Sequence, residues 1–366
     1  MTKNIGKQVK VVVGVSGGVD SSVAAYILKQ QGYEVLALHM KSSNSETAED
    51  DERRARDICD KIGVKLEVVD YKDEMQIVKD YFVSEYKIGR TPNPCVLCNK
   101  TVKFKPFVEY AEKVGADYLA TGHYARIEHV DGQHILFKAK DEAKDQTYFL
   151  NQLSQEQLAK VLFPLGDLSK DEVRGIAAKI GFDTEKTKES YDVCFLGSQK
   201  FKDYISKIIP EEQGNIVDVS TGNVVGKHNG LSKYTLGQRK GLGLGGGLGK
   251  TLEPWFVSKK DIKTNTLYVA QGNDDLLYSD ALICGEVNWI PNIPEQTSFD
   301  CFAKFRYRQK EQAVTVKVDR EKTLVEFKEK QRSITPGQYV VFYDNEKCLG
   351  GACISNVVKD GKILDI

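Results

Sequence analysis

The sequence predicts an α/β domain with a parallel, doubly wound sheet, followed by a small central domain and a C-terminal β-barrel. Over roughly the first 200 residues, short apolar runs alternate with helical patterns, which is typical of a parallel sheet. Beyond residue 280 the helical periodicity disappears and short β-rich runs take over. We expect the three parts to span residues 1–203, 204–278 and 279–366.

The composition is that of a globular protein. Of 366 residues, 41% are apolar and 28% charged, and 52 basic residues balance 52 acidic ones. These values exclude a disordered chain, a fibre and a strongly charged nucleic-acid arm. No stretch approaches the roughly 18 apolar residues of a membrane span, and the first residues lack the apolar core of a secretory signal. We therefore expect a cytoplasmic protein without a membrane partner, whose eight cysteines are reduced.

The first elements form a strand–loop–helix unit. A β-branched run at 9–15 predicts a buried strand. A loop with the sequence SGGVDSS at 16–22 follows, and then a helix to about Gln31 that Gly32 ends. Residues 34–40 predict the next strand, and the acidic stretch 42–57 predicts a loop that leads into a solvated helix face. Further strands are expected within 64–69 and 116–121.

The loop at 16–22 has the features of a phosphate site. Its two glycines let backbone N–H groups converge on an anion, and the start of the helix adds a positive dipole end. Ser16, Ser21 and Ser22 supply hydroxyl donors, and Asp20 is a candidate magnesium ligand. The loop resembles the S-G-G-x-D-S pyrophosphatase loop of enzymes that cleave ATP between its α and β phosphates. A capped helix after a glycine turn is the less favoured interpretation.

The second half of the chain begins with a glycine-rich stretch. Seven glycines among residues 237–249 exclude a packed helix or strand. A G-x-G-x-x-G match at 241–246 follows no strand, so a dinucleotide site is excluded there. Six β-rich runs come next, and their spacing predicts a small antiparallel barrel. They lie at 281–287, 299–306, 313–318, 323–327, 338–343 and 347–354.

The cysteines form two groups. Cys95 and Cys98 lie three residues apart in a proline-stiffened loop, and Cys194 lies farther along the chain. No second Cys pair or His pair completes a zinc site at ligand spacing. The other cysteines sit in apolar patterns that are typical of inert core thiols. They are Cys59, Cys284, Cys301, Cys348 and Cys353.

Eight motifs follow one another from residue 14 to residue 338. They are GVSGGVDS at 14–21, GRTPNP at 89–94, TGHY at 121–124, KDQTYFL at 144–150, CFLG at 194–197, TLGQRKGLG at 235–243, RYRQ at 306–309 and TPGQ at 335–338. In this order they resemble the motifs of the bacterial tRNA-specific 2-thiouridylases, and the resemblance runs from about residue 10 to the C-terminus. It implies an adenine nucleotide alpha hydrolase-like fold for the catalytic domain.

The resemblance also implies a chemistry. ATP adenylates the C2 oxygen of the wobble uridine and releases pyrophosphate. A persulfide on Cys194 then supplies sulfur, and Cys98 attacks it to release sulfide or to close a Cys98–Cys194 disulfide. Thiolates are needed because a thiol is a weak nucleophile. The implied cofactors are ATP and Mg²⁺, and the implied partners are tRNA and an upstream sulfur carrier protein that donates a persulfide.

The same resemblance assigns site residues. Those implied to contact the nucleotide are Gly14, Val15, Ser16, Gly17, Gly18, Val19, Asp20, Ser21, Met40 and Gly122. Those implied to contact tRNA are Asn93, Pro94, Cys95, His123, Lys144, Asp145, Gln146, Arg306, Tyr307 and Gln338. Charge supports an RNA partner independently, because residues 227–260 hold seven Lys or Arg and one Glu. Basic residues interleaved with aromatic ones at 301–310 add to it, although a solvated face explains both stretches equally well.

Two departures from the family pattern leave alternatives open. Many relatives carry Asp where this chain has Cys95, and Ser42-Ser43 replace an Asn-Trp pair. Three thiols permit either a relay that needs only Cys98 and Cys194 or an iron–sulfur cluster held by Cys95, Cys98 and Cys194. We favour the relay. Two other functions compete: a pyrophosphatase-loop ligase of amidotransferase or argininosuccinate-synthetase type, and an RNA-binding protein with a vestigial nucleotide site.

Overall fold

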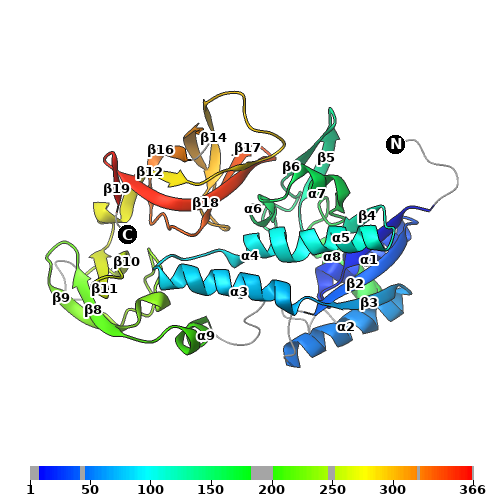
Figure 1. Cartoon of the computed structure of the whole chain (residues 1–366), viewed down its shortest axis with the longest axis horizontal. Helices are drawn as coiled ribbons and strands as arrows, with labels where there is room; N and C mark the ends of the chain where they lie inside the picture. Colours follow the sequence, from blue (N-terminus) through cyan, green and yellow to red (C-terminus); the bar gives the residue numbers. More distant parts are fainter. Residues whose placement is uncertain (1–7, 42–45, 183–200, 246–251, 320–321, 365–366) are drawn as a thin grey trace.

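The computed structural model describes residues 8–41, 46–182, 201–245, 252–319 and 322–364. Figure 1 shows three parts, with the α/β domain on the right, a smaller β-rich part at the lower left and the C-terminal barrel at the upper left. This architecture confirms the predicted fold class.

The α/β domain is built on a five-stranded parallel sheet. Its order is β3 (Lys65–Asp70), β2 (Glu34–Lys41), β1 (Lys10–Gly14), β4 (Tyr118–Ala120) and β7 (Val161–Leu162). The chain therefore builds outward from β1 to β3 and then crosses to the other side of β1 at β4. A crevice for ligands lies at the carboxyl ends of the strands at such a switch point.

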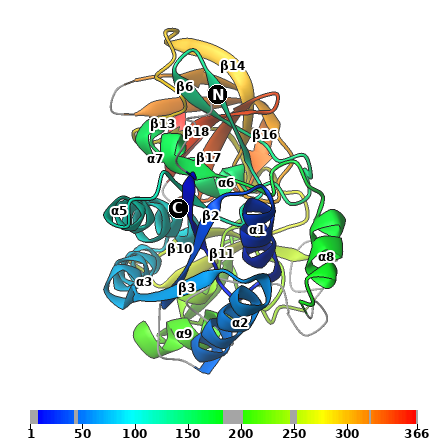
Figure 2. The ribbon, with the colours of Figure 1, turned by 90° about the vertical axis from the view of Figure 1, so that its right-hand side faces the viewer.

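Helices cover both faces of this sheet, as Figure 2 shows. Three lie on one face and two on the other: α1 (Val19–Gln30), α2 (Glu46–Ile62) and α8 (Lys170–Lys179) against α3 (Lys72–Lys87) and α5 (Lys105–Lys113). Val11 and Val13 of β1 pack into one apolar core, and Val12 packs into the other. A strand buried on both faces has to be apolar at every position, which explains the run at 11–13. Within the residues described here, no helix is long and apolar enough to cross a bilayer.

Short helices connect these elements. α4 (Pro94–Leu97) continues through the π-helical segment η1 (Cys98–Phe104) into α5, and α6 (Thr147–Leu150) and α7 (Gln155–Lys160) follow β6. The central part begins with α9 (Phe201–Ile208). Its sheet has the order β10 (Trp255–Asp261), β11 (Thr266–Gln271), β8 (Gln213–Asp218) and β9 (Val224–Asn229). Only the β11–β8 pairing within this sheet is parallel.

The C-terminal part is the expected antiparallel barrel. Six strands pair around it and close on themselves, because β18 pairs with both β17 and β12. In order they are β12 (Tyr278–Cys284), β16 (Thr323–Arg332), β15 (Gln312–Lys317), β14 (Ser298–Lys304), β17 (Tyr339–Asp344) and β18 (Lys347–Lys359). The six predicted strands agree with these to within a few residues at most ends. Two short strands, β13 (Asn288–Trp289) and β19 (Lys362–Leu364), pair with β18.

A hairpin from the α/β domain extends the barrel sheet. β5 (Arg126–Val130) and β6 (Gln133–Phe137) pair with each other, and β6 pairs with β18 through Leu136 opposite Cys348. Leu136 and Cys348 are both fully buried. The sequence analysis did not predict this hairpin. The first and third parts of the chain thus share one sheet.

Candidate active site

The loop at 16–22 leaves β1 and starts α1, as predicted. Gly17 has a left-handed φ of +83°, and a Cβ atom there would lie 2.3 Å from the backbone oxygen of Asp51. No larger residue fits this position, because α2 packs directly on the loop. Gly18 is the N-cap of α1. Gly14, which ends β1, and the buried Val15 lead into the loop, and Val19 is the first residue of α1.

Hydroxyl groups hold the loop in shape. The Ser16 backbone N–H donates to Ser21 Oγ over 3.1 Å, and Ser22 Oγ donates to the Gly18 carbonyl over 2.8 Å. The Gly18 N–H points at Ser16 Oγ, 3.3 Å away. Hence the serines fix the loop backbone. Of the three predicted hydroxyl donors, only Ser16 is exposed, whereas the buried Ser21 and Ser22 hydroxyls donate to the Gly18 carbonyl, so the prediction that they face a ligand is wrong.

Gly122 closes the other side of the loop. It follows β4, and a Cβ atom at Gly122 would lie 2.6 Å from the Ser21 nitrogen and 2.7 Å from the Asp20 carbonyl carbon. The two segments are 100 residues apart in the chain, yet their backbones touch. Met40 lies at the carboxyl end of β2, one strand away from β1. The structure thus brings Gly122 and the loop together at the switch point between β1 and β4, and Met40 lies on the neighbouring strand β2.

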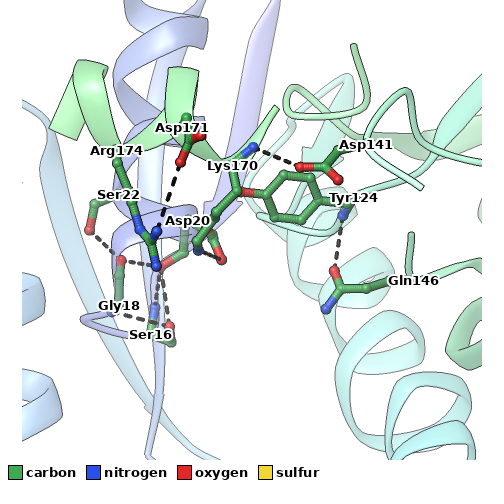
Figure 3. Close-up of polar contacts among 11 residues, drawn as sticks. Ser16, Gly18, Asp20, Ser22, Tyr124, Asp141, Gln146, Lys170, Asp171 and Arg174 are labelled. Carbon is green, nitrogen blue, oxygen red and sulfur yellow. Dashed lines mark hydrogen bonds and ion pairs between the residues drawn. The ribbon is translucent and has the colours of Figure 1, made fainter. Parts of the chain in front are cut away.

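Asp20 takes part in a polar cluster that the sequence analysis missed. Lys170 Nζ contacts both carboxylate oxygens of Asp20, at 2.7 and 2.9 Å, and the Tyr124 hydroxyl donates to Asp20 Oδ1 over 2.9 Å. Figure 3 shows Lys170 reaching from α8 to the loop, with Tyr124 beside it. The Lys170 side chain is only 10% exposed. No sequence motif pointed to Lys170, because it lies 150 residues from Asp20.

Lys170 and Tyr124, the two partners of Asp20 described above, are held in place by hydrogen bonds from their own backbones. The Lys170 backbone N–H donates to Asp141 Oδ2 over 2.9 Å, and the Tyr124 N–H donates to Gln146 Oε1 over 2.9 Å. A capping box between Ser169 and Glu172 fixes the start of α8. Lys170 and Tyr124 are therefore ordered by their own backbones before any ligand arrives.

The Cys95–Cys98 segment lies on the other face of the sheet. Cys95 is in α4, and Cys98 begins the π-helical segment η1. Cys98 is 3% exposed and packs in an apolar cluster with Met75, Val78 and Val102, against which Met40 also packs. Cys194 lies outside the described residues, so its distance from Cys98 stays a prediction. Met40, which is predicted to contact the nucleotide, thus packs against the cluster that holds Cys98.

Three family descriptions match successive parts of the chain. They are the tRNA methyl transferase HUP domain over residues 9–198, the tRNA methyl transferase PRC-barrel domain over 202–271 and the aminomethyltransferase beta-barrel domain over 279–354. The tRNA-specific 2-thiouridylase MnmA of Bacillus cereus is 48% identical over 367 residues, 98% of either chain. That of Alkaliphilus oremlandii is 50% identical over 362 residues, 96% of this chain and 99% of the relative. The chain belongs to the tRNA-specific 2-thiouridylase family. The resemblance drawn from the eight motifs is confirmed.

Solved structures resemble this 2-thiouridylase family member more distantly. The U34-tRNA thiolase NcsA from Methanococcus maripaludis aligns with a TM-score of 0.38 and 22% identity over 57% of this chain and 70% of that chain. A 4-thiouridine synthetase–RNA complex with bound ATP aligns with a TM-score of 0.37 and 19% identity over 52% of this chain and 46% of that chain.

The segment before the cysteines is tied to the barrel in this 2-thiouridylase. The Thr91 N–H donates to the Pro336 carbonyl over 3.1 Å, and the Asn93 N–H donates to the Gly337 carbonyl over 3.3 Å. Gln338 Nε2 donates to the Thr91 carbonyl over 2.8 Å. Pro94, the first residue of α4, is buried. Two of the positions predicted to contact tRNA, Asn93 and Gln338, therefore meet at one junction.

His123 lies beside the loop but is packed among aromatic rings. Its Nδ1 is 2.8 Å from Thr121 Oγ1, and its ring centroid lies 5.8 Å from that of Phe104 and 6.1 Å from that of Phe163. Burial, helped by the nearby positive charge of Lys103, lowers the pKa of His123 to about 3. The imidazole is therefore neutral at physiological pH.

The predicted RNA-contact segment 144–146 is mostly internal. Asp145 is 4% exposed and accepts hydrogen bonds from the Ala139 N–H at 3.1 Å and from Thr147 Oγ1 at 2.7 Å. Burial raises the pKa of Asp145. Lys144 is half-buried in the turn that precedes it. A contact between Asp145 and RNA stays a prediction, whereas its role in folding this segment is visible.

Arg306 joins two parts of the chain. Its Nη2 donates to the Leu236 carbonyl over 3.1 Å, to the Ser333 carbonyl over 2.7 Å and to Thr335 Oγ1 over 2.6 Å. Burial lowers its pKa. Tyr307 packs on Phe149 with ring centroids 4.4 Å apart. The Arg306 guanidinium thus links the barrel to the central part, and its contact with tRNA stays a prediction.

Proposed function

We propose that the protein uses ATP to convert the wobble uridine of tRNA to 2-thiouridine. Three facts support this proposal: the chain belongs to the tRNA-specific 2-thiouridylase family, the phosphate loop lies at the switch point of the sheet, and Cys98 packs with Met40. Family membership carries most weight, because relatives 48% and 50% identical cover 98% and 96% of the chain.

ATP and Mg²⁺ fit the residues present. Gly18, the N-cap of α1, has no side chain to cap the helix, and a Cβ there would meet only Ser16 Oγ at 3.4 Å, so the start of α1 stays open to phosphate. Mg²⁺ prefers carboxylate oxygens, and the loop offers Asp20 for this purpose. Bound Mg²⁺ supplies positive charge that stabilises the leaving pyrophosphate.

Adenylation makes the C2 oxygen a leaving group. The C2 oxygen attacks the α-phosphorus of ATP, the bond from that phosphorus to the bridging oxygen breaks, and pyrophosphate leaves. The negative charge that develops on the phosphates faces the start of α1 and the exposed hydroxyl of Ser16. Because the serines already bond to the loop backbone, these groups need little reorganisation during the reaction.

Sulfur transfer follows at the adenylated C2 atom. The Cys98 thiolate attacks the sulfur of Cys194 in the persulfide, which forms a Cys98–Cys194 disulfide and expels hydrosulfide. Hydrosulfide then attacks C2 and AMP leaves, so that C2 carries sulfur in place of oxygen. A thiol reductant must reopen the disulfide before the next turnover, and an upstream carrier protein must reload Cys194. Cys95, one turn before Cys98, is not required in this relay.

Mass spectrometry of tRNA nucleosides tests the proposal directly. Purified protein with ATP, tRNA and a persulfide donor should yield 2-thiouridine, and omission of ATP should abolish it. Cys98→Ser and Cys194→Ser should abolish the product, whereas Cys95→Ser should retain measurable thiolation. If all three substitutions remove both activity and a brown colour from anaerobically purified protein, the three cysteines hold an iron–sulfur cluster instead. Pyrophosphate release that Cys98→Ser leaves unchanged, with no 2-thiouridine formed by the unmodified protein, would favour a pyrophosphatase-loop ligase.

A further inference from the structure

Lys170 has no role in the chemistry described above, although its position beside the loop at 16–22 indicates one. It is a lysine with 10% side-chain exposure whose ammonium lies against the phosphate loop. Lysines are seldom buried, because desolvation of the charge is costly unless a partner compensates for it. Here Asp20 compensates with both carboxylate oxygens, at 2.7 and 2.9 Å.

The ion pair neutralises a carboxylate that would otherwise repel the phosphates of ATP. Asp20 is the second residue of α1, at the helix end where phosphate is expected to bind. An unpaired carboxylate there would oppose a polyphosphate chain, whereas a carboxylate with a lysine on both oxygens adds no net negative charge. Asp20 therefore does more in this site than offer a metal ligand.

The contacts around Lys170 fix the position of its ammonium group. Its backbone is anchored by Asp141, and the Tyr124 hydroxyl donates to Asp20 Oδ1, which Lys170 also contacts. Arg174 lies one turn further along α8, and in Figure 3 it points from that helix toward the loop. Residues four apart lie on the same face of a helix. α8 thus presents two cations, Lys170 and Arg174, on the side that faces the start of α1.

We propose that Lys170 binds the pyrophosphate end of ATP, and that Asp20 and Tyr124 are positioning residues that hold its ammonium ready for this contact. The ammonium exchanges its contact with one Asp20 oxygen for a phosphate oxygen when ATP binds. The inference rests on the proposed function only in taking ATP as the ligand. It assigns to α8 the second half of a phosphate site whose first half is the loop at 16–22.

Calorimetric titration of the whole protein with ATP, AMP and inorganic pyrophosphate, in EDTA and without tRNA, tests the assignment. Lys170→Met should weaken ATP and pyrophosphate binding at least tenfold and change AMP binding less than twofold, because AMP lacks the β and γ phosphates. Lys179→Met, at the exposed end of the same helix, should leave all three affinities unchanged. EDTA removes any contribution of a metal ion at Asp20.

The double variant Lys170→Met/Asp20→Asn guards against simple misfolding. It removes both charges together, so it should melt close to the unmodified protein and still bind ATP at least tenfold more weakly. Equal weakening of ATP and AMP, or unchanged ATP affinity with a lower melting temperature, would show that Lys170 only ties α8 to α1. If the unmodified protein binds ATP and forms 2-thiouridine while Lys170→Met matches it, this inference fails and the proposed function stands.

Discussion

A single methyl group at Gly122 should disable the nucleotide site. In Gly122→Ala, the new Cβ would lie 2.6 Å from the Ser21 nitrogen and 2.9 Å from the Ser21 Cα. Ordinary van der Waals contact between heavy atoms begins near about 3.4 Å. Since the obstructing atoms are backbone, they cannot rotate away, and the loop must separate from the end of β4 by roughly 0.8 Å.

Two effects follow from this displacement. Overpacking of this size lowers the free energy of unfolding by about 1–3 kcal/mol. A shift of nearly 1 Å in a group that positions a reacting phosphate lowers the rate on the order of 100-fold. We therefore expect pyrophosphate release to fall by about two orders of magnitude while the α/β domain still folds.

Gly175→Ala is the matched control. Gly175 lies within α8, and a Cβ there meets nothing within 4 Å. Alanine is the better helix former by roughly 1 kcal/mol, so this variant should be more stable and fully active. Pyrophosphate release measured with a coupled assay, together with thermal melting, separates the two variants. Normal pyrophosphate release by Gly122→Ala would refute the close approach between Gly122 and the loop.

Three further results are expected. Asp20→Ala and Ser16→Ala should reduce pyrophosphate release far more than tRNA binding, measured by filter binding, because they alter the phosphate loop alone; equal loss of both in folded protein would contradict this. Replacing the exposed basic residues Arg239, Lys240 and Arg308 by Gln should weaken tRNA binding. The slope of the logarithm of the binding constant against the logarithm of the salt concentration should become shallower by roughly 2–3. Arg306→Gln should instead chiefly lower the melting temperature, because Arg306 donates hydrogen bonds within the protein itself. The pKa of His123 is about 3 in the folded protein and near 6.5 in the unfolded chain, so between these pH values only the unfolded chain gains a proton. The free energy of unfolding should therefore fall as the pH drops below about 6.5, by at most roughly 1.4 kcal/mol per pH unit. Chemical unfolding at pH 5 and 7 should show a smaller difference for His123→Gln than for the control His129→Gln, and an equal difference would disprove the half-buried, neutral imidazole.

Local sequence signals predicted the parts of the site that lie close together in the chain. The strand, loop and helix around residues 16–22 depend on β-branching, two glycines and a capping position, all within a short window. The same holds for the barrel strands, whose apolar alternation shows at short range. Cys59, Cys284 and Cys348 lie in the core as their apolar surroundings indicated, and burial raises the pKa of each thiol.

Contacts between segments that are distant in the chain could not be predicted from the sequence, for a physical reason. Lys170 lies in a polar helix start of the kind found on many surfaces, and only the fold of the sheet brings it to Asp20. Gly122 and the hairpin β5–β6 follow the same rule, because their partners lie 100 or more residues away. The stretch 42–57 was interpreted as leading into a solvated face, yet Ala55 of α2 is fully buried and Asp51 covers Gly17. The many charged residues of this stretch made the buried face of α2 hard to recognise in the sequence.

The junction between Thr91 and the barrel has a consequence for how the protein opens. The amide protons of Thr91 and Asn93 are bonded to carbonyls of Pro336 and Gly337, which lie some 240 residues away in sequence. Their exchange with solvent therefore requires that the barrel separate from the segment in front of Cys95 and Cys98. The segment in front of the cysteines is thus held in place by hydrogen bonds to the C-terminal part. Removing the barrel would free this segment, and with it Cys95 and Cys98, to move even though every residue of the α/β domain remained.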